Sequence, residues 1–188
     1  MHICFHSSSL FKLRTTNKNE GGARSAPSLG CAAEGGALFL HRHSVLYISD
    51  SELSGNLVSG ALTSNGGAIS ALTDSNVMLQ NTVLRGNLVA NGARDSRGGA
   101  MFMWLGQWRS RLQVRNATFV DNAAEGGGLS STGGALYADE GVVVDMEDCR
   151  FHENRARGSP EARAGARVGG SAAEEGGWVL SRGDSGSL

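Results

Sequence analysis

Residues 35–56 form a pattern that returns three more times along the chain, at 66–87, 98–122 and 133–154. Each unit opens with Gly-Gly-Ala and an apolar residue, and the openings lie 31, 32 and 35 residues apart. A fixed period of this size is typical of a solenoid, in which each repeat buries its apolar face only against its neighbours. The period therefore predicts a stack of similar coils.

Each unit continues with a short segment in which apolar and variable residues alternate. In the first unit, Leu46 and Ile48 flank Tyr47. A period of two is typical of a β-strand with one buried face. We predict three short strands in each coil, which in the first coil lie at Leu38, at 46–48 and around Leu53. The alternation also predicts an apolar column inside the stack, made up of Leu46, Val77, Leu112 and Val144.

Two polar columns accompany the strands and are interpreted as structural ladders. Asn and Asp tolerate the left-handed backbone of a sharp corner, and stacked Asn side chains hydrogen-bond to one another. The double glycines suit another corner, where a Cβ would obstruct a turn with positive φ or a close approach of coils. The corner column consists of Asp50, Asn81, Asn116 and Asp148, and the column that closes each unit consists of Asn56, Asn87, Asn122 and Asn154.

These columns predict an all-β fold, a right-handed parallel β-helix of about four clear coils. The coils begin near residues 35, 66, 98 and 133 and together occupy 35–157. Residues 1–34 are predicted to be an irregular lead-in or a degenerate coil. Residues 158–188, rich in Gly, Ala and Arg, are predicted to be a flexible tail. Because neither flank has the character of a cap, we expect a fragment of a larger solenoid, or end-to-end stacking with further coils.

Composition excludes several classes of function. The 17 basic and 18 acidic residues nearly balance, which leaves no footprint for nucleic acid or an anionic membrane. Three cysteines are too few and too scattered for a disulfide framework, and no apolar run is long enough for a transmembrane helix. His41 and His43 lie two residues apart, but no third ligand recurs nearby. We therefore predict no metal site and no cofactor.

The repeats resemble those of chlamydial-type polymorphic outer membrane proteins, within the wider group of pectin-lyase-like β-helix proteins. The resemblance lies in Gly-Gly-Ala plus an apolar residue, as at 35–38, paired with F/L-x-x-N, as at 119–122, and it covers about 35–154. Two of the four units carry Leu where that family prefers Phe. The resemblance implies a protein of the cell surface, the outer membrane or the extracellular space, with a role in adhesion. No signal peptide is visible at the N-terminus.

The residues of one outward face also suggest an alternative function, that of a carbohydrate-active enzyme, either a polysaccharide lyase or a glycoside hydrolase. Asp145 and Glu147 share this face, with Arg115 one coil away. Residues two apart on a strand are separated by about 6.5–7 Å, a range suited to glycoside chemistry by paired carboxylates. The same residues also fit a cross-coil ion pair between Arg115 and Glu147, with Asp145 in solvent. We favour the ion pair, because no supporting polar cluster is visible in the neighbouring coils.

The third unit carries an insertion, MWLGQW, that places Trp104 and Trp108 on a predicted loop. Aromatic side chains there could bind a glycan or a cell-surface protein, or fold back over the sheet as a lid. The sequon Asn116-Ala117-Thr118 matches a glycosylation acceptor, although Asn116 is expected to be engaged in the corner ladder. The preferred interpretation is a non-catalytic surface or secreted repeat protein that presents a contact surface, because the inward pattern is constant while the outward chemistry varies.

Overall fold

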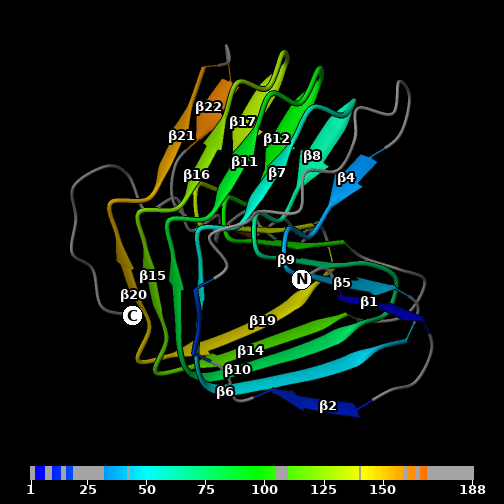
Figure 1. Ribbon diagram of the computed structural model, residues 1–188, viewed down its shortest axis with the longest axis vertical. Helices are drawn as coiled ribbons and strands as arrows, with labels where there is room; N and C mark the ends of the chain where they lie inside the picture. Colours follow the sequence, from blue (N-terminus) through cyan, green and yellow to red (C-terminus); the bar gives the residue numbers. More distant parts are fainter. Residues whose placement is uncertain are drawn as a thin grey trace.

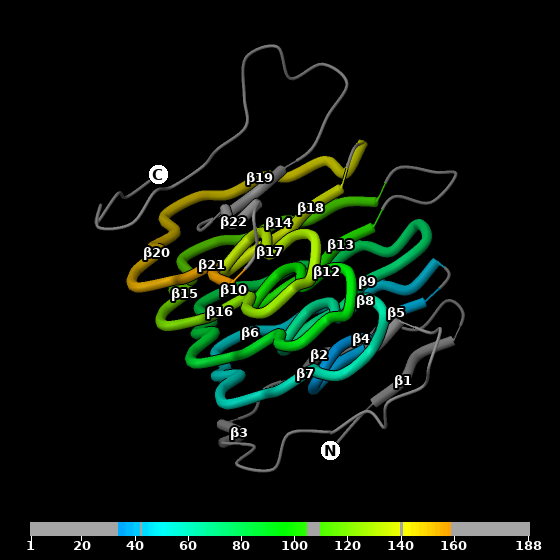
Figure 2. The backbone as a smooth tube through the Cα atoms, turned by 90° about the horizontal axis from the view of Figure 1, so that it is seen from above, coloured from blue at the N-terminus to red at the C-terminus, as the bar shows by residue number. Residues whose placement is uncertain are grey.

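A computed structural model describes residues 3–6, 10–13, 16–18, 32–41, 43–104, 110–139, 141–158, 161–163 and 166–168. Within these ranges the regular structure is entirely β, and strands from successive coils pair in parallel in four sheets. Figure 1 shows two sheets across the lower half, which we call the body, and two sheets side by side above it, which we call the arm. Figure 2 shows the coils as successive loops of one stack.

The body consists of a short and a long sheet. The short body sheet comprises β1 (Ile3–His6), β5 (Leu38–His41), β9 (Ile69–Ala71), β13 (Met101–Met103), β18 (Leu136–Ala138) and β23 (Ala166–Val168). The long body sheet comprises β2 (Leu10–Leu13), β3 (Thr16–Lys18), β6 (Val45–Ser54), β10 (Asn76–Arg85), β14 (Arg111–Arg115), β15 (Thr118–Val120), β19 (Val143–Glu147) and β20 (Arg150–His152).

The arm also consists of two sheets. The first arm sheet comprises β7 (Leu57–Ser59), β11 (Leu88–Ala90), β16 (Ala123–Glu125) and β21 (Arg155–Arg157). The second arm sheet comprises β4 (Ala32–Glu34), β8 (Thr63–Asn65), β12 (Asp95–Arg97), β17 (Ser130–Thr132) and β22 (Glu161–Arg163). The prediction of three strands per coil was wrong on two counts. The second and third predicted strands are one strand, β6, in the first coil, and the arm strands were missed.

The interior of the body contains the predicted apolar column. Leu46 pairs with Val77, Val77 with Leu112, and Leu112 with Val144. The first three are fully buried, and Val144 packs against the same core. The arm has a smaller core of Val58, Ala61 and Val89. The predicted stack of about four parallel coils is therefore confirmed.

The double glycines lie where each coil passes from the arm to the body. The first glycine of each pair has positive φ, as at Gly66 (63°) and Gly98 (66°). The second glycine packs against the start of the first arm sheet and against the next coil. A Cβ on Gly99 would lie 1.9 Å from the carbonyl oxygen of Gly134 and 2.6 Å from the backbone of Ala123. The two glycines therefore meet two different requirements, a left-handed turn and a close approach of backbones.

Strands in both flanks extend the sheets of the clear coils. β1 pairs with β5, β2 and β3 pair with β6, and β4 pairs with β8. At the other end, β22 pairs with β17 and β23 pairs with β18. Much of 1–34 and 158–188 lies outside the described residues, so the domain boundaries drawn from the sequence stay predictions. Across the described residues, no helix has the length and apolarity to cross a membrane.

Candidate functional site

The asparagines that close each unit form a buried ladder. Asn56 Nδ2 donates to Asn87 Oδ1 at 2.8 Å, Asn87 Nδ2 to Asn122 Oδ1 at 2.9 Å, and Asn122 Nδ2 to Asn154 Oδ1 at 2.9 Å. Each Oδ1 also accepts from the backbone N–H of the preceding asparagine, and the Nδ2 of Asn87 also donates to the Leu53 carbonyl oxygen. Apart from Asn56 Oδ1, which is buried without a hydrogen-bond partner among the described residues, the side-chain groups named here are used within the stack, so this column joins coils to one another.

The corner column is a second ladder, and it faces solvent. Asn81 Nδ2 donates to Asp50 Oδ1 and Asn116 Nδ2 donates to Asn81 Oδ1, both at 2.9 Å. All four corner residues adopt the left-handed backbone, with φ of 49°, 50°, 47° and 54° for Asp50, Asn81, Asn116 and Asp148. Asn and Asp suit this conformation, because their short polar side chains lower the free-energy cost of the left-handed backbone.

The outer face of the long body sheet brings together the outward residues of four coils. Tyr47, Met78, Gln113 and Asp145 align across β6, β10, β14 and β19, and so do Ser49, Gln80, Arg115 and Glu147. The Tyr47 hydroxyl donates to Gln80 Oε1 at 2.6 Å and so links the two columns. We call this surface the outer body face. Amide, guanidinium, phenol and carboxylate groups make up most of its side chains.

The three residues of the catalytic alternative meet on this face. Arg115 lies 3.5 Å from the Asp145 carboxylate and contacts the Glu147 carboxylate directly. The side chains of Arg115, Asp145 and Glu147 are 51%, 41% and 58% exposed. The structure thus contains the predicted ion pair and adds Asp145, which the sequence interpretation left in solvent. One guanidinium therefore engages both carboxylates of the catalytic alternative.

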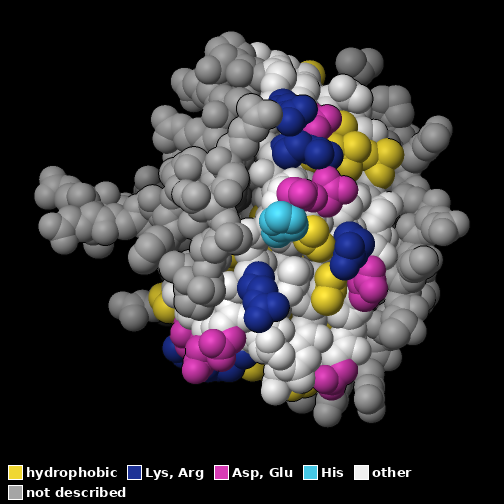
Figure 3. Space-filling model, turned by 90° about the vertical axis from the view of Figure 1, so that its left-hand side faces the viewer, with side chains coloured by type: hydrophobic (Ala, Val, Ile, Leu, Met, Phe, Trp, Pro, Cys, Tyr) yellow, Lys and Arg dark blue, Asp and Glu magenta, His cyan; other side chains and the backbone are white. Residues whose placement is uncertain are grey.

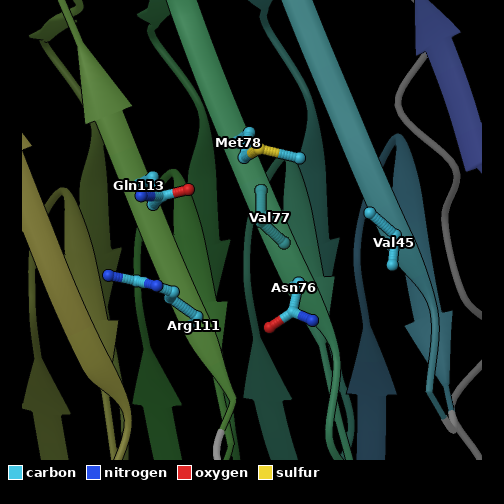
Figure 4. Close-up of a pocket in the computed structure, with 6 residues that line it drawn as sticks. All are labelled: Val45, Asn76, Val77, Met78, Arg111 and Gln113. Carbon is cyan, nitrogen blue, oxygen red and sulfur yellow. The ribbon is translucent and has the colours of Figure 1, made fainter.

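A shallow depression of about 200 Å³ occupies one corner of the outer body face. It is lined by Val45, Asn76, Val77, Met78, Arg111 and Gln113. In Figure 4 the Met78 side chain extends toward β6 and the Gln113 amide toward β10, while Arg111 extends toward β19. Sites for drug-sized ligands usually measure about 300–1,000 Å³. The depression therefore has room only for a small chemical group.

The predicted aromatic recognition loop is described only in part. Trp104 is 43% exposed, and its ring centroid lies 6.1 Å from that of Phe102. Its backbone N–H donates to the Ala71 carbonyl oxygen at 2.9 Å. Trp108 lies outside the described residues. Trp104 follows β13 of the short body sheet, so it does not belong to the outer body face, and its binding role stays a prediction.

The two histidines of the sequence analysis sit near the turn between the body sheets. The His41 ring stacks on Phe39 with centroids 6.0 Å apart, and His43 Nδ1 lies 3.8 Å from Asp74 Oδ2. Among the residues that the structure describes, no three His, Cys, Asp or Glu side chains gather as metal ligands would.

A polar cluster that sequence reasoning missed lies where the second arm sheet meets the short body sheet. The Glu34 carboxylate accepts hydrogen bonds from Asn65 Nδ2 at 2.8 Å and from the Ser70 hydroxyl. On β12, two coils from Glu34, the Asp95 carboxylate accepts hydrogen bonds from Arg97 and Ser130, both at 2.8 Å. Ser70 is fully buried, so no substrate can reach its hydroxyl. In the sequence, a polar residue precedes each double glycine, and this repeated position could have indicated the cluster.

Burial gives Glu34 an unusual protonation equilibrium. It raises the pKa of this carboxyl from an ordinary 4.5 to about 7, against the opposing effects of the bonds from Ser70 and Asn65 and the charge of Arg97. Between these two values the folded chain holds a proton that the unfolded chain has lost. The free energy of unfolding therefore falls as pH rises through this window.

We expect the wild-type chain to lose on the order of 2 kcal/mol of stability between pH 5 and pH 8 relative to Glu34→Gln. The glutamine keeps a hydrogen-bonding amide but does not titrate. Urea unfolding of both proteins at several pH values measures the difference, which cancels the titration of other groups. Parallel pH profiles of the two proteins would show that Glu34 is ionised at pH 5 in the folded state.

Comparison with known proteins gives no match to a family model, a curated protein or a solved structure, so the class of this chain is the one its fold defines, a parallel β-solenoid.

Proposed function

We propose that this chain is a non-catalytic β-solenoid of the cell surface or the secreted space. Its outer body face serves as a contact surface for a glycan or a cell-surface protein. The observation that carries this proposal is the contrast between the two sides of the long body sheet. The inward column is apolar in every coil, whereas the outward neighbours Tyr47, Met78, Gln113 and Asp145 differ in chemistry.

The outer body face has features of a surface that binds without reacting. Its amide, phenol and guanidinium groups offer directional hydrogen bonds to hydroxyl or peptide groups, and Val45 and Met78 offer small apolar contacts. Elsewhere, both signs of charge are interspersed, as Figure 3 shows for the face on the left of Figure 1. Arg155 pairs with Asp121 at 3.0 Å, for example. Among the described residues on that face, neither sign of charge forms an extended patch.

We expect the chain to be retained on an immobilised polysaccharide or matrix protein without cleaving it. The probes are cellulose, xylan, polygalacturonate, heparin, collagen and fibronectin. Truncating the depression with Asn76→Ala and Gln113→Ala together should weaken retention on the bound probe about tenfold, the scale of losing one important contact. The matched control is Arg157→Gln on the first arm sheet, which should bind as the wild type does. Equal retention of all variants would place the contact elsewhere and refute this surface.

The catalytic alternative is tested in the same assay. Release of soluble sugar from a polysaccharide, lost in both Asp145→Asn and Glu147→Gln, would replace the contact proposal with a carbohydrate-active enzyme. We expect no release from the wild type, because Arg115 engages both carboxylates. A larger solenoid of which this chain is a fragment would extend the same face by further coils, and this leaves the expected result unchanged.

A further inference from the structure

We infer that Asn116 is an acceptor site for an N-linked glycan in a eukaryotic secretory pathway. The inference needs the secreted route of the proposed function but not its contact surface. Asn116 begins the sequon Asn116-Ala117-Thr118 and occupies the corner between β14 and β15. Its side chain is exposed, because the corner ladder lies on the outside of the stack. The predicted engagement of Asn116 in the corner ladder is confirmed by its bond to Asn81, and its exposure is the additional observation.

The hydrogen bonding of Asn116 leaves its amide nitrogen available. A side-chain amide nitrogen carries two hydrogens. One of them is used in the bond from Asn116 Nδ2 to Asn81 Oδ1 at 2.9 Å. On glycosylation a bond forms between this nitrogen and C1 of the sugar, the bond from C1 to the phosphate of a lipid-linked pyrophosphate donor breaks, and one amide proton is lost. The remaining N–H can still donate to Asn81, so the modification is compatible with the ladder.

The fold also determines which of the two asparagine columns can carry a sequon. In the buried column, the residues two positions after the asparagines include Val58, Val89 and Ala124, and these are buried in the arm. A hydroxyl at those positions would be buried without an assured partner. In the corner column, the corresponding residue points outward, and it is Thr118 in the third coil, aligned with Val83 and Arg150. The Thr118 hydroxyl therefore costs the fold little.

The test is secretion of the full chain from eukaryotic cells behind an added signal peptide. The readout is the mass of the secreted chain before and after treatment with an amidase that removes N-glycans. The wild type and Thr118→Ser should each carry one glycan. Thr118→Ala and Asn116→Gln should carry none. Thr118→Ala is the sharper control, because it retains Asn116 and its bond to Asn81.

A secreted wild type with the mass of the unmodified chain would overturn the inference. If secretion fails, cell-free translation with endoplasmic-reticulum microsomes gives the same readout, and an unmodified wild type there also overturns it. A separate measurement tests whether the glycan is compatible with the corner ladder. The glycosylated wild type and Thr118→Ala should differ by less than about 4 °C in Tm, and a larger drop in the glycosylated chain would show that the glycan breaks the corner. Binding assays on Thr118→Ala test the contact surface separately.

Discussion

Replacing Asn87 with leucine is expected to lower the free energy of unfolding by roughly 4 kcal/mol or more, a large share of the about 5–15 kcal/mol that is usual for a folded domain. Asn87 is fully buried, and its amide accepts from Asn56 Nδ2 and the Asn56 backbone N–H while donating to Leu53 and Asn122. Leucine has a similar size but leaves these buried groups without partners, and each one costs about 1–3 kcal/mol. Urea unfolding followed by circular dichroism measures the loss.

The matched control for this prediction is Asn81→Ala in the corner ladder. Asn81 also stacks between two coils, through bonds to Asp50 and Asn116, but it is exposed. Water can replace its hydrogen bonds, although alanine tolerates the left-handed backbone less well, so the expected loss is about 1–2 kcal/mol. Similar losses at both positions would mean that burial does not distinguish the two ladders.

Gly99→Ala is expected to be the second severe substitution, with a loss of at least about 3 kcal/mol or failure to fold. The added methyl group would lie 1.9 Å from the Gly134 oxygen and 2.6 Å from the Ala123 backbone. Both obstacles are backbone atoms, one in the next coil and one in β16, so they cannot move aside as a flexible side chain would. The two coils would have to separate and lose the hydrogen bond from the Gly99 N–H to the Gly133 carbonyl oxygen.

Gly86→Ala is the matched control, because it tests the left-handed turn without a close approach. Gly86 has a φ of 58°, but a Cβ there would meet nothing within 4 Å. Its cost is therefore the backbone strain alone, about 1–2 kcal/mol. If Gly99→Ala were no more destabilising than Gly86→Ala, the close packing of the second glycine would not matter to stability.

The stack itself could be predicted from the sequence because parallel pairing places equivalent residues above one another. Register, buried column and ladders all follow from one period, so the spacing of Asn56, Asn87 and Asn122 carries much of the information. The exposure of the corner ladder could not be predicted in this way. A period gives the position of a residue along the axis but not which side of the turn is covered.

The second arm sheet could not be predicted, because it has no apolar signal. The inward residues of β8, β12 and β17 are Ser64, Ser96 and Ser131, all fully buried. Two of these serines accept hydrogen bonds from backbone N–H groups near the arm tip, Ser96 from Gly92 at 3.2 Å and Ser131 from Gly127 at 3.1 Å. A buried strand built on serine therefore looks like a polar loop in the sequence. The cluster around Glu34 was missed for a related reason, since its members come from two sheets.

The hydrogen bonds of the buried ladder join each coil only to its immediate neighbours, and they repeat the same donor and acceptor at every junction. A whole unit can consequently be duplicated or deleted by recombination and still present matching chemistry to whatever it joins. Genes for this architecture can therefore change the length of the molecule in steps of one repeat, while point substitutions on the outward columns diversify each step independently.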